Sequence, residues 1–418
     1  MAMLDARNIK IGLRRYVGKQ KQTLKYRVIS PARYVSDRLH VGVTSTSSRP
    51  IRMALVSDKD AFCSEEQFYP FDMYRVALRE KLNLISANLL LKDVLRAPKA
   101  ILAPFDIIAL KMSYRTNSTE ALYVARTIRN AASDKRLIYF DGDDDICVQW
   151  PEILPFVDSY IKKHAFRDRS NYLKRFSGKS NLHDYVHRKF GHTFNGYDYG
   201  NDGDKFTLIL ESGPVATDQL GKIHVGYNLA LDRLITNLYA KSRLVTSSKV
   251  KENDIIFRGA VKSEAWVYHL RKDVEPVLKR LPDSYRIIMP TKRVPVAEYY
   301  REMTSSKICI SPFGFGEICW RDFEAVLCGC LLIKPDMGHV ETNPDIFKPY
   351  ETYVPVKWDF SDLAEKCVHY LENESERERI VAQARVVLDD FYNNDGFIKF
   401  ISKMLDAVHY ERAAVATS

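Results

Sequence analysis

The chain has 418 residues, which is too long for one ordinary hydrophobic core and favours two domains. Its formal net charge of +10 favours an anionic partner such as nucleic acid, an anionic membrane surface or a phosphorylated small molecule. No apolar stretch is long enough to span a bilayer and the N-terminus lacks the apolar centre of a signal peptide, so we expect a cytoplasmic protein.

The N-terminal region, residues 1–50, is predicted to be a basic arm followed by a polar linker. We interpret it either as a solvated arm or as an attachment to anionic lipid at the inner membrane face, where each basic residue contributes roughly 1 kcal/mol. No RNA-binding motif accompanies the charge, so nucleic acid is not expected as a partner. The basic residues of the arm are Lys10, Arg14, Arg15, Lys19, Lys21, Lys25 and Arg27.

Residues 51–245 alternate between predicted strands and helices, which is typical of a doubly wound, Rossmann-like α/β domain. Residues 165–205 are expected to form an irregular surface insertion, and its histidines lack the carboxylate pattern of a metal site. The seven cysteines are odd in number and include no CxxC, so we expect reduced thiols. In chain order we predict a strand at 51–57, a helix near 74–90, a strand at 106–113, a helix at 118–133 and a strand over 135–145 that opens into an acidic loop.

Residues 246–385 repeat the alternation and are predicted to form a second Rossmann-like domain. Helices follow from residue 360 to the C-terminus. The predicted strands of this block are 253–261, 285–290, 307–312, 331–334 and 352–356, and the predicted helices are 265–281, 294–306 and 318–328.

A glycine turn separates two apolar runs of the second block. Gly314 and Gly316 allow the backbone to approach a ligand closely. A helix beginning near Ile318 would direct its free N–H groups at this turn, where phosphate is the natural ligand, and Arg321 could hold a diphosphate. Glu324, about two turns beyond Glu317 on the same helix face, could accept hydrogen bonds from the vicinal hydroxyls of a ribose. A solvated helix N-terminus capped by acids is the alternative interpretation.

The segment FEAVLCGCLLI, residues 323–333, resembles the donor-binding region of GT-B glycosyltransferases, and the resemblance extends over about residues 254–356. It implies two Rossmann-like doubly wound domains that face a cleft, followed by C-terminal helices, of which the last, residues 386–418, returns to the N-terminal domain. By this resemblance residues 51–245 form the acceptor domain and residues 246–385 the nucleotide-sugar donor domain.

The resemblance also implies roles for single residues. Glu324 would hold the donor ribose, and the diphosphate would lie against the glycine turn. Many retaining members have a glutamate eight positions before the ribose glutamate, where this chain has Gly316, so Glu317 takes that catalytic role or the sugar is held differently. The donor-binding residues that it implies are Arg258, Gly259, Lys292, Gly314, Phe315, Gly316, Arg321 and Glu324.

The acidic loop GDDD after the strand at 135–141 has three interpretations. Asp141 and Asp143 form a DxD, the metal-binding signature of GT-A glycosyltransferases, and could hold a divalent ion that bridges a nucleotide diphosphate. In a GT-B enzyme one of the two could instead be the general base for the acceptor hydroxyl. The third interpretation is a solvated acidic turn.

Together these patterns predict a glycosyltransferase that moves a sugar from a nucleotide-sugar donor to a glycan or lipid-linked acceptor. Synthesis of a cell-surface polysaccharide such as lipopolysaccharide is the expected setting, with the enzyme cytoplasmic or peripheral at the membrane. We expect no required cofactor and no required metal. The alternatives are a metal-dependent GT-A-like transferase that uses Asp141 and Asp143, and a non-enzymatic scaffold that binds nucleotide or polyanion.

Overall fold

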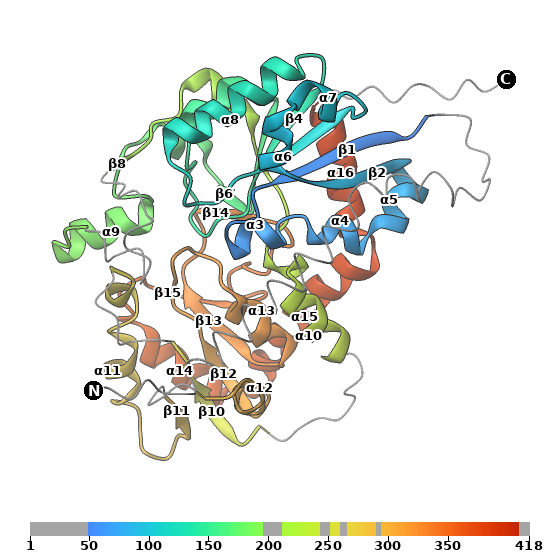
Figure 1. Ribbon diagram of the computed structural model, residues 1–418. Coiled ribbons are helices and arrows are strands. Elements are labelled where there is room, and N and C mark those ends of the chain that lie inside the picture. Colours follow the sequence, from blue (N-terminus) through green and yellow to red (C-terminus); the bar gives the residue numbers. More distant parts are fainter. Residues whose placement is uncertain (1–48, 195–210, 243–250, 260–265, 290–293, 409–418) are drawn as a thin grey trace, which may run out of the picture.

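The computed structural model describes residues 49–194, 211–242, 251–259, 266–289 and 294–408 (Figure 1). The basic arm and Lys292 lie outside these ranges. No disulfide joins the seven cysteines, all of which lie in the described part. Within the described ranges, no helix has the length and apolar character that a membrane crossing requires.

The first domain is built on a six-stranded parallel sheet with the strand order β2-β1-β3-β4-β5-β9. All five residues of β3 are buried, as expected for a parallel strand covered on both faces. The strands are β1 (Ile51–Ser57), β2 (Leu84–Leu90), β3 (Ile107–Lys111), β4 (Arg136–Asp141), β5 (Ser159–Lys162) and β9 (Ile223–Val225).

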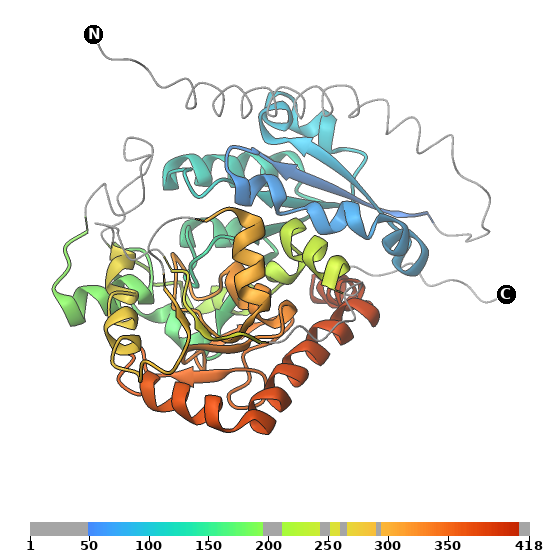
Figure 2. The ribbon, with the colours of Figure 1, turned by 90° about the horizontal axis from the view of Figure 1, so that it is seen from below.

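Helices cover both faces of this sheet. One face packs against α6 (Leu91–Arg96), α7 (Pro98–Leu102) and α8 (Ser118–Ala131). The other face packs against α4 (Tyr69–Met73), α5 (Arg75–Leu82) and α16 (Gly396–Ala407), the last helix of the chain. The red C-terminal helices run from the second domain back to the first (Figure 2).

The predicted helix at 74–90 is wrong in its second half. Helix α5 ends at Leu82 because Asn83 adopts a left-handed backbone conformation with φ of 50°. The next residues form strand β2, which pairs with β1 along its whole length. Since the run LISANLL is apolar at most positions, its pattern does not distinguish a buried helix from an edge strand.

The second domain contains a five-stranded parallel sheet with the order β11-β10-β12-β13-β15. When the strands of each sheet are numbered in chain order, both sheets begin 2-1-3-4-5, a doubly wound order. The predicted fold class is confirmed. The strands are β10 (Asn253–Ile256), β11 (Ile287–Ile288), β12 (Ser306–Ile310), β13 (Leu331–Pro335) and β15 (Val354–Val356); the helices are η7 (Trp266–Leu270), α11 (Val274–Leu278), α12 (Val296–Thr304), α13 (Trp320–Leu327), α14 (Leu363–Glu372) and α15 (Glu374–Asn393).

The two domains meet along a short antiparallel pair of strands. Strand β6 (His164–Phe166) follows the first sheet, and β14 (Val340–Thr342) belongs to the second domain. The Asn228 side chain adds hydrogen bonds to Thr342 and Pro344 across the same boundary. The hydrophobic core that contains α8 continues into the second domain through residues such as Phe323, so the domains share packed side chains.

The segment predicted as an irregular insertion, 165–205, is more regular than expected. Residues 195–205 lie outside the described part, but the rest contains η2 (Arg169–Leu173), β7 (Phe176–Ser177) and α9 (Asn181–Phe190). Helix α9 packs against η7 of the second domain, and its Tyr185 contacts Trp358 edge-to-face at 5.0 Å between ring centroids. The remaining elements are α3 (Phe62–Glu66), η1 (Pro151–Phe156), β8 (Glu211–Ser212), η5 (Thr217–Lys222), η6 (Leu229–Leu231) and α10 (Arg233–Ser242).

Candidate active site

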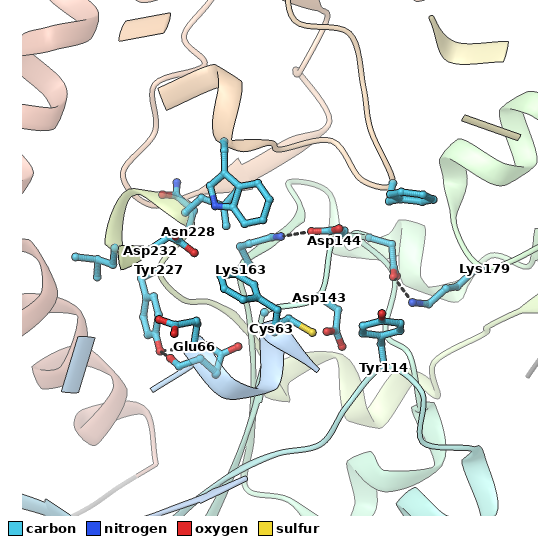
Figure 3. Close-up of a pocket in the computed structure, with 18 of the residues that line it drawn as sticks. Cys63, Glu66, Tyr114, Asp143, Asp144, Lys163, Lys179, Tyr227, Asn228 and Asp232 are labelled. Atoms are coloured by element: carbon cyan, nitrogen blue, oxygen red, sulfur yellow. Dashed lines mark hydrogen bonds and ion pairs between the residues drawn. The ribbon is translucent and has the colours of Figure 1, made fainter. Parts of the chain in front are cut away.

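A cavity of about 340 Å³ lies between the two domains (Figure 3). Its first-domain wall is formed by α3, by the loop after β4 and by the segment from Tyr227 to Asp232. Its second-domain wall consists of the side chains of Trp266, Phe315 and Trp320. Ligands of doubly wound sheets bind outside the carboxyl ends of the strands, which is where this loop lies.

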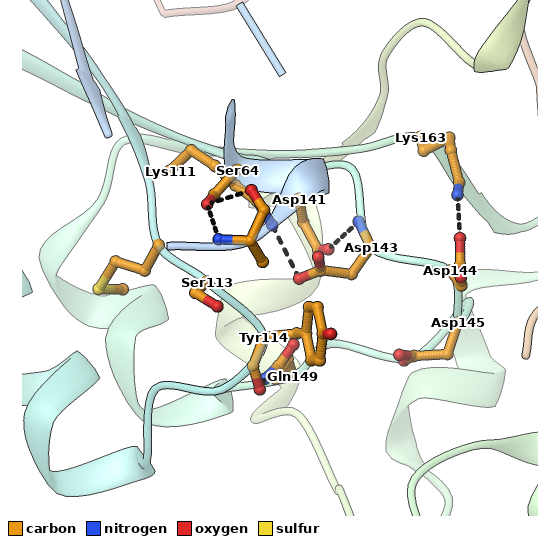
Figure 4. Close-up of polar contacts among 12 residues, drawn as sticks. Ser64, Lys111, Ser113, Tyr114, Asp141, Asp143, Asp144, Asp145, Gln149 and Lys163 are labelled. Atoms are coloured by element: carbon orange, nitrogen blue, oxygen red, sulfur yellow. Dashed lines mark hydrogen bonds and ion pairs between the residues drawn. The ribbon is translucent and has the colours of Figure 1, made fainter. Parts of the chain in front are cut away.

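Residues 141–145, called the acidic loop below, are neutralised by four lysines, of which Figure 4 shows Lys111 and Lys163. Three of these lysines stand at or just after the carboxyl ends of β3 and β5, and the fourth comes from the segment before α9. Each aspartate accepts a hydrogen bond from a lysine ammonium of its own. The pairs are Lys162–Asp141 at 2.7 Å, Lys111–Asp143 at 2.8 Å, Lys163–Asp144 at 3.0 Å and Lys179–Asp145 at 2.7 Å.

Asp141, predicted to be catalytic, is buried at the end of β4 and does not line the cavity. Its Oδ2 accepts from the Lys162 ammonium and from the Tyr160 hydroxyl at 2.8 Å. Burial alone would raise the pKa of this carboxyl, but the charges of Lys162 and Lys111 and the hydrogen bonds from Lys162 and Tyr160 together outweigh burial and hold the pKa below its usual value. Asp141 is therefore a weak base, held in place by its partners.

Asp143, the second residue of the DxD, does line the cavity, although Lys111 occupies its Oδ2. The ammonium groups of Lys162 and Lys111 thus occupy Oδ2 of Asp141 and Oδ2 of Asp143, which a divalent ion would need as ligands. Among the described residues, no group of three or more His, Cys, Asp and Glu side chains is arranged to hold a metal. The geometry of the pair thus favours an ion-paired structural loop over the GT-A interpretation.

Three consecutive basic residues, Lys162, Lys163 and His164, lie at and just after the end of β5. All three side chains are buried, with exposed fractions of 1%, 4% and 0%. A sequence signal for this arrangement exists, because the buried strands β3 and β5 both end in lysine next to an acidic loop. A lysine at the end of a buried strand needs a carboxylate, and the loop provides one.

The glycine turn 314–316 of the second domain lies directly against the acidic loop of the first. A Cβ atom placed on Gly316 would come within 1.6 Å of the Asp144 carbonyl oxygen. The close approach predicted at this residue is therefore made to the other domain. Phe315, between the two glycines, is 49% exposed and lines the cavity.

Helix α13 begins at Trp320, two residues later than predicted, with Cys319 as its N-cap residue. The Cys319 amide donates to the Asp322 carboxylate at 2.9 Å, and Asp322 in turn pairs with the buried Lys334 at 3.2 Å. This amide at the start of the helix is thus already satisfied by the chain itself. Since Glu317 precedes the helix, it does not share a helical face with Glu324, and that expectation was wrong.

Glu317, predicted to be catalytic, is fully buried and links the domains. One carboxylate oxygen lies 3.0 Å from Nε2 of His164, and the other lies 3.6 Å from Nε2 of His339. Burial would raise the pKa of Glu317, but the hydrogen bonds of the two histidines outweigh it and keep the pKa below its usual value. Glu317 does not line the cavity.

The structure brings most of the predicted donor-binding residues together at the switch point of the second sheet. Arg258 and Gly259 follow β10, and the glycine turn follows the neighbouring strand β12. Arg321 donates to the Arg258 carbonyl at 3.4 Å, and the Arg258 guanidinium pairs with Glu302. In open α/β sheets the ligand crevice lies at this switch point.

Glu324, the predicted ribose ligand, is 7% exposed and held by two tyrosines. The Tyr299 hydroxyl donates to its Oε2 at 2.6 Å and the Tyr300 hydroxyl to its Oε1 at 2.8 Å. Both tyrosines come from α12, directly before β12. The pair fixes the orientation of the carboxylate while each oxygen retains a second acceptor position.

Sequence reasoning missed Arg271, which lies beside Arg321. Its Nε donates to the Phe313 carbonyl at 2.9 Å, and its Nη2 lies beside Gly314. Burial and then the charge of Arg321 lower the pKa of Arg271 to about 10. Nη1 of Arg321 is buried with no hydrogen-bond partner in the described part of the chain. Two adjacent guanidiniums are an environment that suits an anion.

Asp232 was also missed, because one aspartate beside a short apolar run gives no sequence signal. It lines the cavity next to Trp320. Burial raises the pKa of Asp232, and hydrogen bonds from Leu234 and Trp320 offset this only in part. The other carboxylates on the cavity wall pair with lysine or arginine, whereas no cation of the described residues forms an ion pair with Asp232.

Residues 268–401 match the model of a family described as glycosyl transferase-like. The chain carries a glycosyltransferase domain. The match includes the glycine turn, Arg271, Arg321 and Glu324, and it confirms both the resemblance and the enzyme class predicted from the sequence. No curated protein sequence matches the chain significantly.

Solved glycosyltransferase structures give weak matches over most of the chain. An α-glucosyltransferase in complex with UDP is 10% identical, with 84% of this chain and 100% of that chain covered and a TM-score of 0.43. A glycosyltransferase from Rickettsia africae ESF-5 is 11% identical, with 87% and 100% covered and a TM-score of 0.45.

Proposed function

We propose that the enzyme transfers a sugar from a nucleotide-sugar donor to a hydroxyl group of an acceptor in the interdomain cavity. The observation that carries this proposal is the composition of the two cavity walls. One wall contains Phe315 and Trp320 of the glycosyltransferase domain, and the other contains carboxylates of the first domain. A transfer between two substrates needs a site that both domains can reach.

The donor diphosphate would lie at the switch point of the second sheet, against Arg271, Arg321 and the glycine turn. Guanidinium groups there stabilise the negative charge that develops on the leaving diphosphate. Glu324, fixed by its two tyrosines, would accept from the ribose hydroxyls. Arg258 completes this side, and Lys292 keeps its predicted donor-binding role. These cations supply the charge stabilisation, so the proposal requires no metal.

Asp232 is the carboxylate best suited to take the proton from the acceptor hydroxyl. A base works best when its pKa lies closer to neutrality, and burial raises the pKa of Asp232, which its hydrogen bonds and the charges of Lys163 and Arg233 offset only in part. In the transfer step the acceptor oxygen bonds to the anomeric carbon and its proton passes to Asp232. The bond from that carbon to the diphosphate breaks, and the nucleoside diphosphate leaves with the electron pair.

The net charge of the chain and its resemblance to GT-B glycosyltransferases support a setting for the reaction. An acceptor that is a glycan or a lipid-linked glycan belongs to the assembly of a surface polysaccharide. The basic residues of the N-terminal arm would hold the enzyme at an anionic membrane face, where lipid-linked acceptors reside.

A panel of nucleotides and nucleotide sugars tests the donor part by thermal shift. We expect one nucleoside diphosphate and the corresponding nucleotide sugar to raise Tm, since a ligand at 100 times its Kd stabilises the folded protein by about 2.7 kcal/mol. Activity that survives EDTA supports the metal-free mechanism, and loss of activity in EDTA supports the GT-A alternative. If no nucleotide stabilises the protein, the proposed function is wrong.

The variant Asp232→Asn tests the base. We expect kcat to fall by about 10²–10⁴-fold while the thermal shift with nucleotide is unchanged, because only proton transfer is removed. The exposed Asp218, changed to Asn, is the matched control and should keep the wild-type rate. A wild-type kcat in Asp232→Asn would contradict the assignment.

A further inference from the structure

We infer that the acceptor is an uncharged sugar, whose hydroxyl groups donate to Asp143 and Asp145 at the end of the cavity that also contains Tyr114 and Phe315. This inference rests on the proposed function and specifies the substrate class of the acceptor. Figure 3 shows Tyr114 and Lys179 at one side of the cavity, Asp232 and Tyr227 at the other, and Asp143 between them.

Two carboxylate oxygens on this wall lack a partner in the described part of the chain. Oδ1 of Asp143 and Oδ1 of Asp145 are both buried and accept no hydrogen bond, although the residues line the cavity. The exposed fractions of the two residues are 4% and 3%. Lys111 and Lys179 neutralise the charge of these two carboxylates, but each ion pair leaves one oxygen of its aspartate without a hydrogen bond.

Such oxygens point to a ligand that donates hydrogen bonds. Leaving a buried acceptor unpaired is unfavourable, and a carboxylate is a stronger acceptor than a neutral group. Two acceptors two residues apart on one loop can take the hydroxyls of a single sugar ring. Hydroxyl groups fit this requirement, whereas phosphates and carboxylates bring only acceptors of their own.

The opposite wall offers an apolar surface for the same ring. Phe315 is 49% exposed and contacts Trp266 edge-to-face at 6.3 Å between ring centroids. Aromatic side chains left exposed inside a cavity mark a binding surface, and their faces suit the C–H face of a pyranose ring. The volume of about 340 Å³ falls in the range of small-molecule sites.

The charges on the wall exclude an anionic acceptor group. Five carboxylates line the cavity, and four of them are paired with a lysine or an arginine, which leaves the charge of Asp232 without an ion pair. A phosphate, a sulfate or a uronic acid would therefore meet lysines that are already paired and the negative charge of Asp232 in a partly buried site, which is unfavourable. The basic net charge of the chain does not extend into this cavity. The carboxylates are those of Glu66, Asp143, Asp144, Asp145 and Asp232.

The experiment measures the release of nucleoside diphosphate from the donor identified by thermal shift. Neutral oligosaccharides are compared with their phosphorylated, sulfated and uronic acid counterparts as acceptors. We expect at least one neutral oligosaccharide to accelerate release more than tenfold, and the anionic counterparts to have no such effect. Faster release with an anionic acceptor than with its neutral form would overturn the inference.

Two variants test whether the acceptor binds at the end of the cavity that contains Asp143 and Phe315. Asp143→Asn and Phe315→Ala should each raise the KM for the neutral acceptor at least tenfold. Phe315 is exposed, so its substitution tests the site even where Asp143→Asn weakens folding by leaving Lys111 unpaired. Asp134→Asn, a change at a carboxylate that is 74% exposed, is the matched control. An unchanged acceptor KM in both variants would refute the subsite, whereas loss of nucleotide binding in the wild type would refute the proposed function itself.

Discussion

Gly316 illustrates how a single residue can be predicted to matter for the wrong reason. The sequence indicated a glycine that lets a ligand approach the backbone, and the structure places the Asp144 carbonyl there instead. The two domains can meet at this point only because Gly316 has no side chain. The residue thereby fixes the position of the acidic loop relative to the glycosyltransferase domain.

We expect Gly316→Ala to lower the free energy of unfolding by at least about 1–3 kcal/mol, because a Cβ atom would overlap a backbone oxygen that cannot rotate away. Gly314→Ala is the control. Its Cβ would lie 3.2 Å from Nη2 of Arg271, the end of a flexible side chain, so a smaller loss is expected. Urea unfolding of both variants measures the difference, and equal stabilities would contradict the close contact.

The candidate catalytic residues were harder to predict than the donor-binding ones. The glycines and Glu324 belong to a local motif, so their proximity follows from a strand, a turn and a helix. Asp232 and Arg271 lie in other segments, and only the packing of those segments brings them to the site. Conversely, the sequence identified Asp141 and Glu317 as candidate catalytic carboxylates, but it did not indicate that Lys162 and His164 are their partners in the fold.

At the scale of elements, the strand order could be predicted in part. The alternation of apolar runs and amphipathic helices indicated two doubly wound sheets, and both are present. Strand β2 was missed because its apolar pattern also fits a helix. The acidic loop could have been interpreted as ion-paired, since β3 and β5 both end in lysine at the same edge of the sheet.

We expect Lys162→Met to destabilise the first domain by about 3–5 kcal/mol, because it leaves the buried carboxylate of Asp141 without its counter-ion. The exposed pair Arg96–Asp93 supplies the control. Arg96→Ala removes an ion pair of the same type at the surface and should cost no more than about 1 kcal/mol. Chemical denaturation measures both. Comparable losses in the two variants would mean that the lysines of the acidic loop are not structurally required.

The whole molecule depends on titratable groups buried where its domains meet. His164 of β6 contacts Glu317 of the second domain, and the ring of His183 in α9 lies against that of Trp266, tilted by 31°, with 3.9 Å between ring centroids. Burial lowers the pKa of His164, and burial lowers the pKa of His183 to about 3. Both histidines are therefore neutral in the folded protein at pH values where the unfolded chain already binds protons.

The sign of the resulting pH dependence is fixed. The unfolded chain binds more protons than the folded protein below the unfolded pKa of about 6.5, so stability is fully present above that pH and decreases as the pH falls. For His183 the loss continues down to its folded pKa of about 3. Glu317 acts in the same direction below its own unfolded pKa. Each buried histidine contributes a slope of about 1.4 kcal/mol per pH unit.

Urea unfolding at pH 7.5 and pH 5.5 therefore gives a lower free energy of unfolding at the acidic pH. In His183→Asn the side chain can still accept from Ser180, which lies 2.9 Å from Nδ1 of the histidine, but it no longer titrates. We expect this variant to lose about half of the pH dependence while remaining folded at pH 7.5. If the wild-type protein is as stable at pH 5.5 as at pH 7.5, the histidines are not held neutral at the boundary, and the tight contact between the two domains around the cavity is not maintained in solution.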